Sequence, residues 1–525
     1  MKPGEIAHAV SRGAFYLAIE KLVAVMSGIV YFALLLRWLG PTKYGIMTLA
    51  VSFAGLATVA NGNFEVYLER FAAEYLAHGR FATLRRAHLL AIAVKLGLAL
   101  IASAALVALA PWLARQFEMP ELATLLPVLT ALVITDGLAS TARATLYGLQ
   151  RFRWVSALAV VFHVAKTVMV GALWWSRQGL PELVTGLAVL SVAQGVIATI
   201  IPLVMLRDGR DPDGEGTPGP GELLRTMTHY CLPLLGARVA FTSGQNLGKV
   251  VLGKLLDAEH LGYFSFAFQT VDRFVEVLYV LPNALLPSLT HLVARGERQR
   301  LDGVFAQAFR LIQVTAMTLG VGLVIFAPEL TLLVGSPLFL PAVPVLRILA
   351  LVPLARTAHQ PLTMLFQAMR QPGIVLRLAL LKFAVEFAGV FTLVPLLGVP
   401  GAGWANLAGA VMAFAGALLA ARRLLPEGRI GRMRAVRRSL LLAGVSIGLA
   451  LVAERLVPGA PGLVLRIAIA LAMLLGVLRL GLVTTADLDK LDALPLRAMW
   501  LRSGRTAMLG AVTRVARAVE PRRAM

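Results

Sequence analysis

Charged side chains inside long apolar stretches are the residues of this sequence that can do chemistry. A charge at the centre of a membrane span costs about 2.5 to 3.5 kcal/mol on insertion scales, so the helix normally turns it toward protein or water. Guanidinium groups bind phosphate oxygens in bidentate fashion and lysines act beside them as point charges, so a surplus of bases favours an anionic ligand. The bases are Lys21, Lys95, Arg143, Lys166, Arg238, Lys249, Arg273, Arg356 and Lys382, and the acids are Glu20, Asp136, Asp272, Glu276 and Glu386.

Seven of these bases are predicted to bind the anionic ligand. They are Lys21, Lys166, Arg238, Lys249, Arg273, Arg356 and Lys382. Arg238, Lys249 and Arg273 are the strongest phosphate candidates. Ion pairing between helices is the alternative role, because Asp272 and Glu276 share a helix face with i, i+4 spacing and can pair with Arg273 or Arg238. Lys95 and Arg143 are predicted to snorkel toward the inner face.

The acids at the same depth are candidates for coupling to an ion. They are Glu20, Asp136, Asp272, Glu276 and Glu386. Among the neutral groups, Gln245 and Asn246 can bind sugar hydroxyls or bond between helices. His163 and His359 are interpreted as hydrogen-bonded packing residues rather than proton relays.

No pattern typical of catalysis or metal binding is present. The sequence has no G-x-x-x-x-G-K-[ST] phosphate loop, and His78 and His88 lack the spacing of metal ligands. The single cysteine, Cys231, is interpreted as a small apolar packing residue. We therefore expect no catalytic residue, no metal and no cofactor, and the chain is not expected to be an enzyme.

The elements that must position these charges are membrane helices. Of 525 residues, 58% are hydrophobic and 15% charged, with a mean hydropathy of +0.77, and the apolar residues form blocks of about 20 or more. Such blocks predict an all-α polytopic membrane protein with about 14 transmembrane helices. The predicted spans are 13–38, 43–63, 86–111, 121–147, 154–176, 182–206, 229–255, 262–290, 304–327, 341–368, 373–397, 401–424, 438–457 and 463–483.

The distribution of basic residues predicts the orientation. Arginines collect in alternate connecting segments and in the 422–438 loop, which places both termini on the cytoplasmic side. This topology explains most of the net charge of +22, so nucleic acid is not an expected partner. Residues 64–77 are predicted to lie along the inner interface, and the Arg-rich tail is predicted to contact anionic lipid.

An internal repeat organises the spans. Leu39–Gly45 corresponds to Leu256–Gly262, and Leu146–Arg151 corresponds to Leu365–Arg370, at offsets of 217 and 219 residues. These offsets predict two pseudo-symmetric six-helix lobes with a ligand site between them, plus two C-terminal helices. The predicted parts are an N-terminal lobe (1–206), a cytoplasmic linker (207–228), a C-terminal lobe (229–425), two additional helices (426–484) and a basic cytoplasmic tail (485–525).

The order of several motifs resembles a known family. Leu-Gly-Pro-x-x-Tyr-Gly at 39–45, Arg-Phe-Ala-Ala-Glu at 70–74 and Leu-Tyr-Gly-Leu-Gln-Arg at 146–151 resemble the lipid-linked oligosaccharide (Wzx-type) flippases of polysaccharide biosynthesis. Their superfamily, MOP, also includes the MATE drug exporters and the lipid II flippases. The resemblance covers about the first twelve spans, and the Arg-rich tail departs from the family pattern.

The resemblance implies a flippase that moves a polyprenyl-pyrophosphate-linked oligosaccharide, a precursor of cell-surface polysaccharide, from the cytoplasmic to the outer leaflet. It implies alternating access through a cationic cavity, with membrane lipids and polysaccharide assembly proteins as partners. The bacterial cytoplasmic (inner) membrane is the implied location, and the two extra helices are expected to form a groove for a lipid tail. The alternatives are an ion-coupled multidrug exporter of the MATE kind and, less favoured, a membrane glycan polymerase or ligase. The sequence leaves open the glycan, the coupling ion and the oligomeric state.

Overall fold

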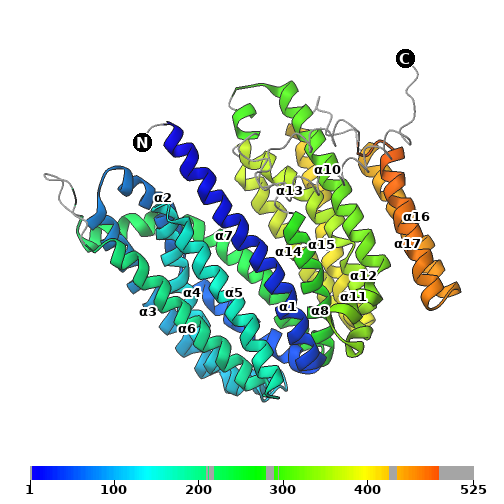
Figure 1. Ribbon diagram of the computed structural model, residues 1–525, viewed down its shortest axis with the longest axis horizontal. Helices are drawn as coiled ribbons and strands as arrows, with labels where there is room; N and C mark the ends of the chain where they lie inside the picture. The colour runs from blue at the N-terminus through cyan, green and yellow to red at the C-terminus, as the bar shows by residue number, and fades with distance from the viewer. Residues whose placement is uncertain are drawn as a thin grey trace. The chain divides into compact units, whose positions relative to one another are not determined.

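The structure is a computed structural model that describes residues 3–207, 211, 218–278, 289–293, 295–369, 371–424 and 434–483 (Figure 1). The predicted basic tail and residues 208–210 and 212–217 of the predicted linker lie outside these residues. The described part of the chain is helical and contains no strand, which confirms the all-α prediction. The chain divides into two compact units, Met1–Ser265 with Thr331–Leu340, and Phe266–Leu330 with Pro341–Met525.

The first unit is built from long helices. They are α1 (Pro3–Ala57), the short 3-10 helix η1 (Thr58–Asn61), α2 (Phe64–Ala77), α3 (Phe81–Gln116), α4 (Leu122–Gly148), α5 (Phe152–Trp175), α6 (Leu180–Met205), α7 (Pro220–Leu255) and the start of α8 (Ala258–Leu278). Helix α4 packs on both α3 and α6, and α1 packs along α5 and α7. Helix α7 therefore belongs to the same unit as α1 to α6.

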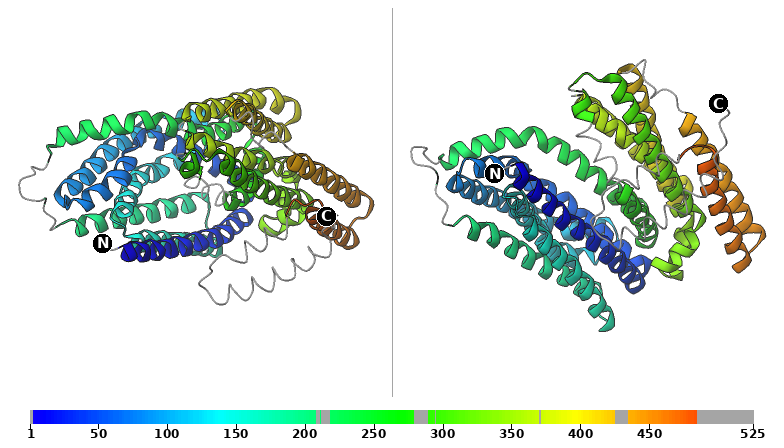
Figure 2. Two further views of the ribbon diagram at one scale, coloured as in Figure 1. Left: turned by 90° about the horizontal axis from the view of Figure 1, so that it is seen from above. Right: turned by 45° about the horizontal axis from the view of Figure 1, so that its top comes forward.

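The second unit contains the rest of α8 and the later helices. These are α10 (Arg298–Ile325), α11 (Ala327–Val334), η2 (Pro337–Ala342), α12 (Val343–Leu349), α13 (Val352–Ala368), α14 (Pro372–Leu397), α15 (Val399–Leu424), α16 (Arg434–Leu456) and α17 (Ala460–Arg479), of which the end of α11 and most of η2 cluster with the first unit. Helix α14 packs along α15, and α16 pairs with α17. The two views in Figure 2 show this orange α16–α17 pair side by side.

Most predicted spans coincide with helices. In the described residues, ten helical segments are long and apolar enough to cross a membrane, and the first, Phe15–Asn61, covers most of the first two predicted spans. The two spans are separate helical segments of α1 that meet at a kink at Gly40, where φ is 66° and ψ is −179°. Glycine is favoured there because a Cβ clashes in this region of backbone space. Helices α7, α8 and α14 are not among the ten, and each carries charged side chains.

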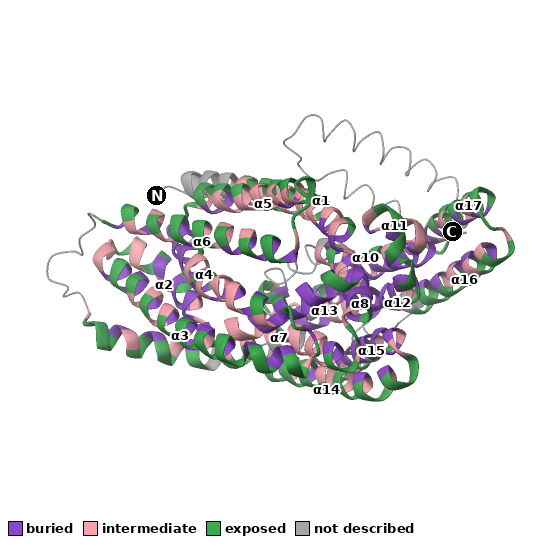
Figure 3. Ribbon diagram, turned by 90° about the horizontal axis from the view of Figure 1, so that it is seen from below, coloured by how far each residue is buried: buried purple, intermediate pink, exposed green. Residues whose placement is uncertain are grey.

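Burial varies strongly between helices (Figure 3). Helix α13 is buried along most of its length, whereas α5 and α16 expose many apolar side chains. An exposed apolar surface of this extent is unfavourable in water, but it suits a helix that faces hydrocarbon. This pattern agrees with a polytopic membrane protein.

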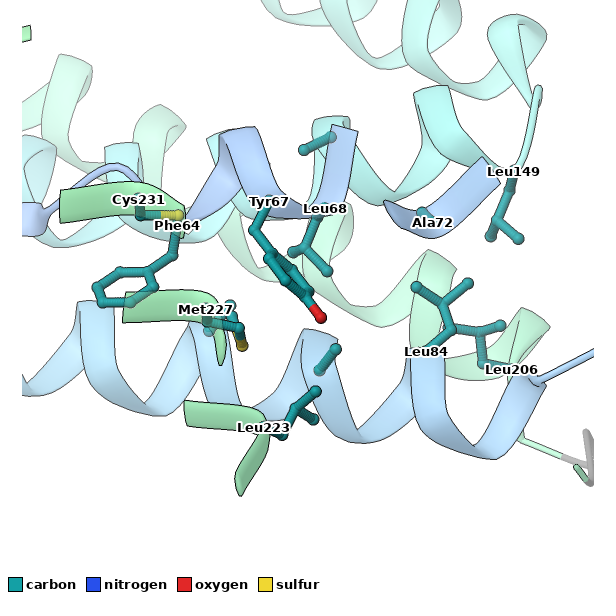
Figure 4. Close-up of a cluster of buried hydrophobic side chains, with 13 residues drawn as sticks. Phe64, Tyr67, Leu68, Ala72, Leu84, Leu149, Leu206, Leu223, Met227 and Cys231 are labelled. Atoms are coloured by element: carbon teal, nitrogen blue, oxygen red, sulfur yellow. The ribbon is translucent and has the colours of Figure 1, made fainter. Parts of the chain in front are cut away.

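The core of the first unit surrounds α2. Figure 4 shows Tyr67 and Leu68 of α2 among Leu84 of α3 and Met227 and Cys231 of α7. Tyr67 is 1% exposed, and its hydroxyl lies 2.6 Å from that of Tyr75. The buried Cys231 is a packing residue, as predicted.

Candidate functional site

The Arg238 cluster is a group of four charges in the first unit: Glu65 on α2, Lys95 on α3, Asp136 on α4 and Arg238 on α7. The Nη1 atom of Arg238 donates a hydrogen bond to Oε1 of Glu65. Its Nη2 atom lies 3.6 Å from Oδ2 of Asp136. One arginine thus bridges two carboxylates that belong to different helices.

Lys95 occupies the buried end of this cluster. Its side chain has 0% exposure, and Nζ donates to Oε2 of Glu65 at 2.6 Å and to Oγ of Ser140 at 2.8 Å. The prediction that Lys95 snorkels is therefore wrong. A snorkelling lysine needs water for its ammonium group, whereas here a carboxylate and a hydroxyl on neighbouring helices replace that water.

The local sequence explains why Glu65 points inward. Gly62, with a φ of 71°, ends η1, and α2 begins at Phe64. Glu65, Leu68 and Ala72 then follow at i, i+3 and i+7, so they share one helix face. All three are buried.

Glu65 is a site residue that the sequence analysis missed. The segment 64–77 is predicted to lie along the membrane interface, where a glutamate at its start needs no partner. The i, i+3, i+7 spacing of Glu65 with Leu68 and Ala72 is the signal that indicates its burial.

The cluster balances its formal charges. Two carboxylates face one guanidinium and one ammonium, so the basic surplus counted along the sequence does not occur within this group. Removing Lys95 or Glu65 breaks a buried pair, which costs about 3 to 5 kcal/mol, while the intact pair contributes far less. Asp136 is about half exposed, so solvent screens its pair with Arg238. The cluster is therefore most sensitive to change at its buried end.

The second unit pairs further predicted site residues. Nη1 of Arg356 on α13 donates to Oδ1 of Asp272 on α8 at 2.8 Å. On α14, Nζ of Lys382 donates to Oε2 of Glu386 at 2.5 Å. The other oxygen of Glu386 accepts a hydrogen bond of 2.5 Å from Nδ2 of Asn406 on α15. Asp272 thus pairs between helices, as in the predicted alternative, but its partner is Arg356 rather than Arg273 or Arg238.

Arg273 and Glu276 form a weaker pair. They lie on one face of α8 with 3.5 Å between Nη1 and Oε2, and both side chains are about half exposed. An exposed pair of this kind contributes about 0 to 1 kcal/mol. Arg273 is accordingly easier to divert to another anion than a buried arginine is.

The remaining predicted residues lie apart from these pairs. Nζ of Lys166 lies 4.3 Å from the ring centroid of Tyr31 on α1, in a cation–π contact. Glu20 accepts a hydrogen bond of 3.0 Å from Oγ of Ser156. Lys21 is exposed on α1, and Lys249 is half-buried on α7.

A second charge network in the second unit was not predicted. Arg466 of α17 is 6% exposed and donates to Glu329 of α11 through both terminal nitrogens. Its Nη1 also lies 3.8 Å from Oε2 of Glu454 on α16, which accepts from Arg347 of α12. These residues stand near the ends of predicted spans, where the sequence gives no reason to expect burial. The network ties α16 and α17 to the rest of their unit.

These arrangements are suited to exchange of anions. A guanidinium held by carboxylates can exchange them for phosphate oxygens, because both ligands accept the same forked pair of N–H donors. Within the described residues, no group of three or more His, Cys, Asp and Glu side chains is placed to hold a metal ion.

Comparisons with known proteins agree with this architecture. The family described as polysaccharide biosynthesis protein matches residues 10–293. An inward-facing multidrug resistance MATE family transporter of the MOP superfamily superimposes with a TM-score of 0.62 at 14% identity, covering 80% of this chain and 99% of that chain. The lipid II flippase MurJ, in an inward closed conformation, superimposes with a TM-score of 0.63 at 12% identity, covering 87% and 97%. No curated protein matches the sequence.

The family match spans more than half of the chain and includes the Arg238 cluster. The structural similarities, at identities of 12 to 14%, show a shared fold. The chain therefore belongs to the polysaccharide biosynthesis protein family, and it is a polytopic membrane protein with the fold of the MOP superfamily.

Proposed function

We propose that the protein is a flippase that moves a polyprenyl-pyrophosphate-linked oligosaccharide from the cytoplasmic to the outer leaflet. The observation that carries this proposal is that a polysaccharide-biosynthesis sequence is folded as a MOP-type helical bundle. MurJ, a protein with that fold, is a lipid II flippase. The proposed cargo shares the chemistry of a lipid-linked anionic headgroup.

The Arg238 cluster supports a role in binding the headgroup. Glu65 and Asp136 both pair with Arg238 in the structure. A diphosphate offers several oxygens with stronger negative charge, so it competes for the same guanidinium. The binding step in this proposal is an exchange of ligands on Arg238, and the displaced carboxylates become available to a proton or another cation.

Other predicted cations extend this proposal along the transport path. Lys21, Lys166, Lys249, Arg273, Arg356 and Lys382 are proposed to contact the cargo in turn. Their carboxylate partners Asp272, Glu276 and Glu386, with Glu20, are proposed to restore neutrality after the cargo leaves. The polyprenyl tail remains in lipid while the headgroup crosses.

The proposed location is a bacterial cytoplasmic membrane with both termini inside, where assembly proteins take over the exported precursor. The N-terminal lobe (1–206) and the C-terminal lobe (229–425) are proposed to alternate access.

An ion-coupled exporter of cations is the second candidate. The MATE similarity, the buried carboxylate of Glu65 and the solvent-accessible carboxylate of Asp136 favour it. The two candidates require different charges. A cationic drug would bind the carboxylates of Glu65 and Asp136, whereas a diphosphate would bind Arg238.

Alanine substitution distinguishes these candidates. We expect Arg238→Ala to reduce surface glycan at normal protein abundance, and Arg225→Ala, an exposed position on the same helix, to leave it unchanged. Lys249→Ala and Arg273→Ala are expected to give partial loss. Normal glycan export in all three site variants contradicts the proposed site. Loss of polymer while the precursor still reaches the outer leaflet supports a polymerase or ligase instead.

A further inference from the structure

The two repeats meet in the first unit through contacts that come in symmetric pairs. Nη2 of Arg37 donates to the carbonyl oxygen of Leu333 at 2.7 Å, and Nζ of Lys254 donates to that of Gln116 at 2.6 Å. Arg37 and Lys254 are separated by 217 positions, and so are Gln116 and Leu333. Each repeat therefore donates, from equivalent positions, to the equivalent carbonyl of the other.

The same offset of 217 positions relates two close backbone contacts beside these bonds. A Cβ added to Gly45 would lie 1.8 Å from the carbonyl oxygen of Ala258, and one added to Gly262 would lie 2.0 Å from that of Pro41. Pro41 and Ala258 are again 217 positions apart. Reciprocal contacts of this kind are the signature of a two-fold relation, as in the isologous interface of a symmetric dimer.

Both acceptors lie at helix ends. Gln116 is the last residue of α3, and Leu333 is the next-to-last residue of α11. The final carbonyls of a helix lack partners within it and carry its negative dipole end, so a cation stabilises them. Arg37 binds a second carbonyl there, since its Nε donates to Gly335 at 3.0 Å.

We infer that Arg37 and Lys254 are a pair of gating residues that hold the two repeats together at the outer end of the protein. This inference rests on the proposed function and on the predicted topology, which places both turns on the outer side. Opening toward the outer leaflet then requires both bonds to break together, because the two-fold relation makes them equivalent. A cavity of about 480 Å³, lined by Thr42, Lys254 and Asp257 among others, lies beside the Lys254 bond.

The strength of each bond suits a gate. Both side chains are exposed, so solvent screens the interaction and each contributes modestly. Two modest bonds hold a closed state without making its opening slow.

A cysteine introduced at position 52 (Ser52→Cys) can report on opening of the gate. Ser52 is 1% exposed and lies on α1 between Leu49 and Gly55, whose positions contact Gly253 and Asn246 of α7. The experiment uses the full chain with Cys231→Ala and Ser52→Cys in intact cells, and an impermeant maleimide is added from outside. Arg37→Ala and Lys254→Ala are each expected to raise the labelling rate about 2- to 5-fold, and the double variant by roughly the product.

Arg115→Ala is the matched control, because Arg115 is exposed at the same end of α3 but donates to Pro111 in its own helix. It is expected to leave labelling unchanged. If abundance falls in the alanine variants, Arg37→Lys and Lys254→Gln are used instead. The lysine is expected to give an intermediate rate, because its one nitrogen replaces the two nitrogens with which Arg37 reaches two carbonyls. Equal labelling in the double variant and the parent, or an equal rise in Arg115→Ala, overturns the inference.

A thiol cross-link separates the gate from the cargo. Gln116→Cys and Lys254→Cys are introduced together and joined by a short bifunctional maleimide. Labelling of Ser52→Cys is then expected to fall to the rate of the closed state. Unchanged labelling after cross-linking contradicts the gate. If cross-linking lowers the labelling rate while glycan export continues, the result supports the gate and contradicts the proposed function.

Discussion

Gly45 and Gly262 lie 217 residues apart, and the Cα of each faces the backbone of the helix segment that carries the other. Any larger residue would place its Cβ within 2.0 Å of a carbonyl oxygen, well inside van der Waals contact. The close approach lets α1 and α8 cross at the contact between the repeats. This crossing supports the Arg37 and Lys254 bonds beside it.

Alanine at either glycine is therefore expected to destabilise the protein. Overpacking of a tight contact costs about 1 to 3 kcal/mol, and the symmetric positions predict similar losses for Gly45→Ala and Gly262→Ala. Thermal unfolding of the purified protein in detergent measures the effect. Gly97→Ala on α3 is the control, because a Cβ there has no neighbour within 4 Å. Equal melting temperatures for all three variants contradict the close approach.

The Arg238 cluster predicts a strong effect at Lys95. Lys95→Met removes the buried partner of Glu65 and is expected to cost about 3 to 5 kcal/mol of stability. Adding Glu65→Gln is expected to recover part of this loss, because it removes the carboxylate that is then in excess and leaves Asp136 and Arg238 balanced. Unfolding measurements on the single and double variants test this, with the exposed Lys43→Met as control. A double variant less stable than Lys95→Met argues against the pairing.

The second charge network predicts that α17 depends on Arg466. Arg466→Met leaves Glu329 and Glu454 with fewer donors, so we expect a loss of about 3 kcal/mol or more. Cleavage by an added protease near α16 and α17 is expected to become faster than in the parent. Arg479→Met, at the exposed end of the same helix, is expected to change neither property. Identical behaviour of the two variants shows that Arg466 does not hold the helix pair.

The fold was largely predictable because hydropathy determines it. Long apolar blocks predict the helices, and boundaries such as α4 at Leu122–Gly148 agree with the predicted span 121–147. The kink at Gly40 and the early start of α7 at Pro220 were harder to predict, since both depend on local backbone geometry and contacts rather than on apolar length.

The internal repeat could be predicted from the sequence, but the contacts between its two copies could not. The offset of 217 at Leu39 and Leu256 predicts equivalent turns. That Arg37 and Lys254 bind carbonyls of the opposite repeat depends on how helices from distant segments meet. A further signal was present in Pro-Val-Leu at 127–129 and 344–346, which repeats at the same offset.

The candidate site was predicted in part. Arg238 and Asp136 were both identified from their depth in a span, and the structure places them together. The pairing with Glu65 depends on α2 packing among α3, α4 and α7, which hydropathy does not encode. A count of charges along the chain gives a basic surplus, whereas neutrality is decided by the neighbours of each charge.

Tracking lipid-linked precursor by leaflet tests the proposed function most directly. In a deletion strain that carries either the parent protein or Arg238→Ala, the precursor exposed on the outer face of the cytoplasmic membrane is measured by its access to an impermeant glycan-modifying reagent. The account predicts outer-leaflet precursor with the parent and accumulation in the inner leaflet without the protein or with Arg238→Ala. Equal amounts of outer-leaflet precursor in all three strains contradict it.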